Sequence, residues 1–101
     1  QPHRYSRVNS LKNEFALSFK SSDAVVLCPV YSAGEKKNYN FSQDKFSQLI
    51  SKQSKIQVIN IKNQEDLKNY INKNLFDDEM VVCMGAGSIS NWIRDIATKL
   101  Q

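Results

Sequence analysis

Apolar residues gather in three short runs along the chain, at residues 24–30, 56–61 and 80–84. Each run is rich in β-branched residues and is apolar almost without interruption. This pattern is typical of strands covered on both faces, as in a parallel sheet. We therefore predict strands at 24–29, 56–61 and 80–84. The first strand should end at about Pro29, because proline has no N–H to donate to a sheet ladder.

Between these runs, apolar residues recur at the spacings of three and four that indicate amphipathic helices. Ser42, Asn63 and Ser88 precede three of these segments, and their side chains are suited to capping a helix N-terminus. The four apolar stripes are Val8, Leu11, Phe15 and Phe19; Phe46, Leu49 and Ile50; Leu67, Tyr70 and Ile71; and Ile89, Trp92, Ile93, Ile96, Ala97 and Leu100.

Helices thus alternate with strands, which predicts right-handed crossovers and a three-layer α/β domain with a mainly parallel sheet. A chain of 101 residues has room for one such domain. However, three strands are few for this fold, and no strand feeds the first helix. We therefore expect residues 1–101 to form a single partial domain whose sheet lacks its first strands.

The charge of the chain argues against a nucleic-acid surface. The net charge is +4, but the lysines are spread along the sequence, whereas such surfaces usually concentrate their charge. Cys28 and Cys83 lie in apolar runs, as buried thiols do. No apolar run is long enough for a membrane span, so we expect a cytoplasmic protein without membrane contact. A non-catalytic basic module that binds nucleotides or nucleic acid remains the alternative.

Three segments should meet where ligands bind in open parallel sheets, beyond the carboxyl ends of the strands. They are QPHRYSR at 1–7, if a strand precedes it, VYSAGEKKN at 30–38 and GAGSIS at 85–90. QPHRYSR places His3, the single histidine of the chain, beside Arg4 and Arg7. Arginines at a helix start oppose the helix dipole unless an anion lies nearby, and their planar fork suits a carboxylate or phosphate. A solvated helix start with a structural histidine is the alternative.

GAGSIS is open to three interpretations. Its glycines, Gly85 and Gly87, could simply form a tight turn from strand to helix, or could bring backbone N–H groups to an anion or substrate. A dinucleotide site is the third, but Ser90 replaces the last glycine of that motif, and no further strand follows to hold a ribose. The chain also has no phosphate-cradling loop, no metal-ligand spacing and no nucleophile–base set. We expect no catalytic residue and no metal ligand in it.

QPHRYSR, VYSAGE and GAGSIS, in this order and spacing, resemble the C-terminal domain of the Mur ligases of bacterial cell-wall synthesis. Among these, the resemblance is to the members that join L-alanine to UDP-N-acetylmuramate. QPHRYSR is the specific part, because the other members carry different residues there. The chain departs from the common form at Ser6 and Ser32, where threonine and proline are frequent, and neither change removes a charge.

The resemblance implies a Rossmann-like domain that brings the amino acid and closes over an ATP site. In a longer polypeptide, one further domain would bind the UDP-sugar, and a central ATPase domain would hold ATP and Mg²⁺. This fragment alone should therefore be inactive. Arg4 and Arg7 would clamp the carboxylate of L-alanine, and His3 would line the same pocket. The resemblance also suggests that the site is lined by loop residues: Tyr31, Ala33, Gly34, Glu35, Gly85, Gly87 and Ser88.

Overall fold

The sheet of this protein consists of two parallel strands, β1 (Ala24–Leu27) and β2 (Gln57–Asn60), in a computed structural model that describes residues 1–37, 40–75 and 77–100. Ala24 lies opposite Gln57, and the register continues to Leu27 opposite Asn60. Two of the three predicted strands are therefore confirmed, as is their parallel pairing. β1 ends two residues before Pro29.

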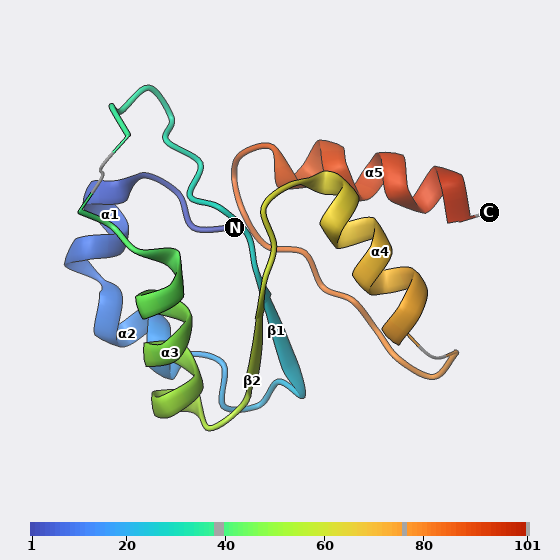
Figure 1. Cartoon of the computed structure of the whole chain (residues 1–101), viewed down its shortest axis with the longest axis horizontal. Helices are drawn as coiled ribbons and strands as arrows, with labels where there is room; N and C mark the ends of the chain where they lie inside the picture. The colour runs from blue at the N-terminus through green and yellow to red at the C-terminus, as the bar shows by residue number, and fades with distance from the viewer. Residues whose placement is uncertain (38–39, 76, 101) are drawn as a thin grey trace.

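Helices cover both faces of this sheet (Figure 1). Three of them lie on one side and two on the other, which confirms the predicted α/β fold with three layers. The first group is α1 (Tyr5–Ser10), α2 (Lys12–Leu17) and α3 (Gln43–Ser54), and the second is α4 (Gln64–Asn74) and α5 (Ile89–Leu100).

Successive residues of each strand pack alternately in two separate hydrophobic clusters. Leu27 and Val58 pack on the side of α1, α2 and α3, whereas Val26 and Ile59 pack on the side of α4 and α5. This alternation follows from the two-residue repeat of a strand. Both faces of the sheet are therefore buried, as the uninterrupted apolar runs predicted. The buried members of the two clusters are Val8, Ala16, Leu27, Phe46 and Ile50; and Cys28, Ile61, Leu67, Ile71, Ile89 and Ile96.

Two helices begin where their capping residues predicted. The Ser42 hydroxyl accepts a hydrogen bond from the Lys45 N–H at 3.2 Å, and the Asn63 side chain accepts one from the Asp66 N–H at 2.9 Å. The Asp66 carboxylate in turn accepts from the Lys62 N–H at 2.9 Å. The bonds to Ser42 and Asn63 satisfy backbone donors that a helix leaves unpaired in its first turn, and the bond from Lys62 fixes the residue before the Asn63 cap.

The first apolar stripe forms two short helices instead of one. The chain breaks at Leu11, which has φ −111° and ψ 17° and separates α1 from α2. Leu11 is exposed, whereas Val8 is buried in the cluster beside β1. In the last stripe, Trp92 is only half-buried and Ala97 is exposed, while the side chain of Leu100 lies outside the described residues. Periodicity therefore overestimated the length of the first helix and the width of the last apolar face.

The third predicted strand is wrong, because residues 80–84 are irregular. Their apolar side chains are largely exposed, with Met80 at 85% and Val82 at 69% of the accessible maximum. A strand needs a neighbour for its N–H and C=O groups, and among the described residues none lies alongside this segment. Its last carbonyl, that of Met84, instead accepts a hydrogen bond from the backbone nitrogen of Gln1 at 2.8 Å. Within the described residues, no helix is both long and apolar enough to cross a membrane.

Candidate functional site

The N-terminal segment lies between the two loops that were predicted to meet it. On one side, the Tyr31 N–H donates to the Pro2 carbonyl at 2.8 Å, and the Arg4 N–H donates to the Tyr31 carbonyl at 2.7 Å. On the other side, Gln1 bonds to Met84, directly before GAGSIS. QPHRYSR, the loop after β1 and GAGSIS therefore converge at the carboxyl end of β1, which confirms the predicted meeting place.

Gln1 joins the N-terminal segment to the start of α5. Its side-chain oxygen accepts a hydrogen bond from the Ile89 N–H at 3.1 Å, and its side-chain nitrogen donates to the Ser88 hydroxyl at 2.9 Å. α5 begins directly after Ser88, as predicted, and the Ser88 carbonyl accepts a hydrogen bond from the Trp92 N–H at 3.1 Å. The side chain of Gln1 satisfies the first backbone donor of α5, that of Ile89. Nothing local in the sequence could reveal this contact, because the partners are 88 residues apart.

Tyr31 forms the aromatic wall of the site. The His3 ring stacks against it with centroids 5.6 Å apart and planes 30° apart. Gly87 lies against the same ring, so that a Cβ added there would come within 2.3 Å of Tyr31 Cγ. Only glycine fits this close approach. The glycine at 87 is thus explained by packing, which favours the tight-turn interpretation of GAGSIS over a dinucleotide site.

Arg4 has an uncommon backbone conformation, with φ 66° and ψ 132°. Positive φ in a residue with a side chain costs on the order of 1–3 kcal/mol and persists only where the surroundings enforce it. Here the bond to the Tyr31 carbonyl and the start of α1 enforce it from opposite sides. Such backbone strain clusters at functional sites, and it sets the direction in which Arg4 leaves the chain.

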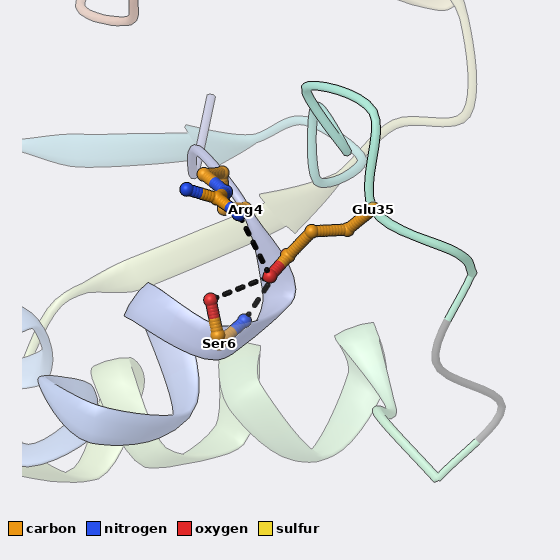
Figure 2. A network of polar contacts seen from close by, with 3 residues as sticks. All are labelled: Arg4, Ser6 and Glu35. Atoms are coloured by element: carbon orange, nitrogen blue, oxygen red, sulfur yellow. Dashed lines mark hydrogen bonds and ion pairs between the residues drawn. The ribbon is translucent and has the colours of Figure 1, made fainter.

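Glu35 supplies an anion beside Arg4 at the start of α1 (Figure 2). Its carboxylate accepts from the Ser6 hydroxyl at 2.6 Å and from the Ser6 N–H at 3.3 Å, and lies 3.5 Å from Arg4 Nη2. The hydrogen bond from the Ser6 hydroxyl is the main cause that lowers the pKa of Glu35. The loop turns back toward α1 through Ala33 and Gly34, which have φ 51° and 89°. The predicted anion at the helix start is thus, in part, a residue of the chain itself.

The remaining polar groups stay open to solvent. Arg7 is exposed on α1, and its side chain has no hydrogen bond or ion pair among the described residues. The side chain of Arg4 is half exposed. An open depression of about 660 Å³ adjoins Glu35 on the surface, and His3, Arg4 and Arg7 are not part of its wall. The depression is lined by Tyr5, Ser6, Asn9, Glu35, Lys36, Lys37 and Asn40.

The cysteines are not positioned for chemistry. Burial raises the pKa of both Cys28 and Cys83, so their thiols stay protonated at neutral pH. Cys28 belongs to the hydrophobic cluster beside α4 and α5, and Cys83 packs against its edge. Across the described ranges, no group of three or more His, Cys, Asp and Glu side chains is arranged to hold a metal ion.

The chain is similar in sequence to ligases from several bacteria. No protein-family model matches the chain. It is 46% identical over 95% of its length to the UDP-N-acetylmuramate–L-alanine ligase of Pelagibacter ubique, and 39% identical over its whole length to that of Fusobacterium nucleatum. The Rhodospirillum rubrum enzyme of the same name is 36% identical over the whole chain.

The fold is of the α/β class. The similarities show that the chain is a partial domain homologous to UDP-N-acetylmuramate–L-alanine ligases, which are Mur ligases. The chain spans about 21% of the length of each of these relatives. It therefore corresponds to one part of a much longer polypeptide.

Proposed function

We propose that the chain is part of the C-terminal domain of an ATP-dependent ligase that joins L-alanine to UDP-N-acetylmuramate, and that this part positions the amino acid. The observation that carries the proposal is the convergence of three loops around His3 and Arg4 in a chain 46% identical to an enzyme of that name. The Arg4 side chain projects from a backbone segment that hydrogen bonds tie to Tyr31 on one side and to Met84 on the other.

In this proposal, Arg4 and Arg7 bind the carboxylate of L-alanine, and His3 lines the pocket beside them. Guanidinium groups suit this task because their donors match the two oxygens of a carboxylate. The amine then faces the muramyl carboxylate, activated as an acyl phosphate, and displaces phosphate to form the amide bond. The chain contributes orientation, which turns an encounter in solution into a reaction within one complex.

ATP and Mg²⁺ belong to the remainder of the longer polypeptide in this account. The chain has no phosphate-cradling motif, and its described residues hold no metal-ligand cluster, so the residues present do not fit either group. The fragment would close over the ATP site without holding it and would be inactive alone. The reaction would take place in the bacterial cytoplasm, where its nucleotide substrates are found.

The proposal is tested by Arg4→Ala in the full-length enzyme. One hydrogen bond to a charged group is worth about 1.5–3 kcal/mol, so the KM for L-alanine should rise by roughly ten- to 150-fold. The KM for ATP should stay nearly unchanged. Arg4→Lys should recover only part of the loss, because an ammonium keeps the charge without the fork.

Arg94→Ala is the matched control, since Arg94 is an exposed arginine of α5. Steady-state titrations would vary each substrate in turn. A rise in the KM for ATP or for the UDP-sugar alone would contradict the carboxylate role of Arg4 and would indicate a phosphate contact instead.

A further inference from the structure

We propose that Glu35 is a positioning residue, which holds the Arg4 guanidinium in place for the carboxylate of the amino acid. The inference rests on the proposed function, because it assigns a task at the same site. Glu35 does not itself touch the substrate in this account. It acts through Arg4, and the start of α1 holds it in place.

The contacts of Glu35 show which of its partners anchors it. Two hydrogen bonds come from Ser6, at 2.6 and 3.3 Å, whereas the contact to Arg4 is a single, longer one of 3.5 Å to Nη2. The carboxylate is therefore fixed by α1 and touches only one edge of the guanidinium. Arginine has five N–H donors, so most of them remain available to a second carboxylate.

The loop that carries Glu35 is tied to the same segment at its other end. Tyr31 exchanges backbone hydrogen bonds with Pro2 and Arg4, at 2.8 and 2.7 Å. Between Tyr31 and Glu35, the loop reverses through Ala33 and Gly34, both at positive φ. Arg4 is thus held by its backbone at the start of this loop and by its side chain at the end. Figure 2 shows the loop returning to place Glu35 beside Arg4 and Ser6.

The charges also fit an orienting role. Arg4 and Arg7 together carry +2, and Glu35 carries −1, which leaves a net charge of +1 for one incoming carboxylate. Without Glu35, the Arg4 cation would stand directly before α1 without the anion that lies beside it in the structure. A competing role is conceivable on the same contacts: Glu35 could occupy Arg4 and exclude the substrate. The two roles predict opposite effects of removing it.

Glu35→Ala in the full-length enzyme separates these roles. We expect the KM for L-alanine to rise by about three- to tenfold, as for the loss of one ordinary hydrogen bond, with little change in the KM for ATP. Glu35→Gln keeps an oxygen that can accept a hydrogen bond from Ser6, so the KM for L-alanine should rise less in this variant. Glu14→Ala, at an exposed glutamate of α2, is the control. Thermal unfolding of each variant identifies any that fail to fold. If Glu35→Ala does not fold, Glu35→Gln replaces it in the test.

The decisive comparison combines Glu35→Ala with Arg4→Ala. If Glu35 acts through Arg4, adding Glu35→Ala to the Arg4→Ala enzyme should leave the KM for L-alanine unchanged. A fall in this KM in the single Glu35→Ala variant would overturn the inference in favour of competition. Independent, multiplying effects would also overturn it. If Arg4→Ala alone raises the KM but neither Glu35 variant does, the proposed function survives and this inference fails.

Discussion

At the scale of single residues, the site is held by a carboxylate whose charge is stabilised by its neighbours. The Ser6 hydroxyl, more than the Arg4 charge, lowers the pKa of Glu35 below its ordinary value. A lowered pKa in the folded state favours folding above the ordinary pKa of a glutamate. This contribution is lost as the pH falls through the lowered value. The network should therefore be intact at neutral pH and disappear only in acid.

We predict that Glu35 titrates below the ordinary range of a glutamate when its carboxyl carbon is followed by NMR against pH. Ser6→Ala should raise the pKa back toward the ordinary value, because it removes the largest cause of the shift. Arg4→Ala should raise it less. An unshifted titration that does not respond to Ser6→Ala would show that the network does not form in solution.

The sequence indicated part of this network but not its partners. The pair Arg4 and Arg7 predicted an anion nearby, and the structure places one, Glu35, beside Arg4. Its identity depends on the turn at residues 33–34, which brings Glu35 to Ser6 from 29 residues away. The contact of Gln1 with α5 was likewise hidden. Such contacts arise from the packing of distant segments, and neither periodicity nor local motifs contain that information.

At the scale of elements, local signals were reliable where an element is stabilised by its own residues. α3 and α4 begin at their predicted caps, because a cap bonds to the backbone three residues ahead. A strand is different, since its backbone is satisfied only by a neighbour. Residues 80–84 have the composition of a buried strand, yet they are irregular and exposed. The sequence predicted a sheet that lacks its first strands, but the composition of residues 80–84 still favoured a strand there.

We predict that residues 80–84 become a protected strand in the full-length protein. Gln1 already bonds to Met84, while Pro2 bonds to Tyr31, so a segment continuing upstream of Gln1 would run between β1 and residues 80–84. Amide hydrogen exchange at Val81 and Val82 should be fast in this 101-residue chain and much slower in the longer protein. Ile59 in β2 provides the control. Equally fast exchange in both would contradict the prediction.

At the scale of the whole molecule, the chain is a small α/β fold that corresponds to one part of longer relatives. Two hydrophobic clusters hold the layers together, and the three loops at the carboxyl end of β1 carry the candidate site (Figure 1). The meeting of the three loops was predicted from a strand before each of them, but in the described sheet only the loop after β1 follows a strand. Hydrogen bonds from the N-terminal segment to Tyr31 and Met84 hold the three loops together. In the proposed function, the chain would provide one wall of an active site, and the remainder of the polypeptide would provide the others.

The most direct test of the central claim is whether Arg4 recognises a carboxylate. The measurement is the ratio of kcat/KM for L-alanine to that for L-alaninamide, in which a neutral amide replaces the charged group. The unaltered full-length enzyme should prefer L-alanine by about ten- to 150-fold. Arg4→Ala should lose most of this preference, while Arg94→Ala should keep it. If Arg4→Ala slowed both substrates equally and left the ratio unchanged, Arg4 would not bind the carboxylate.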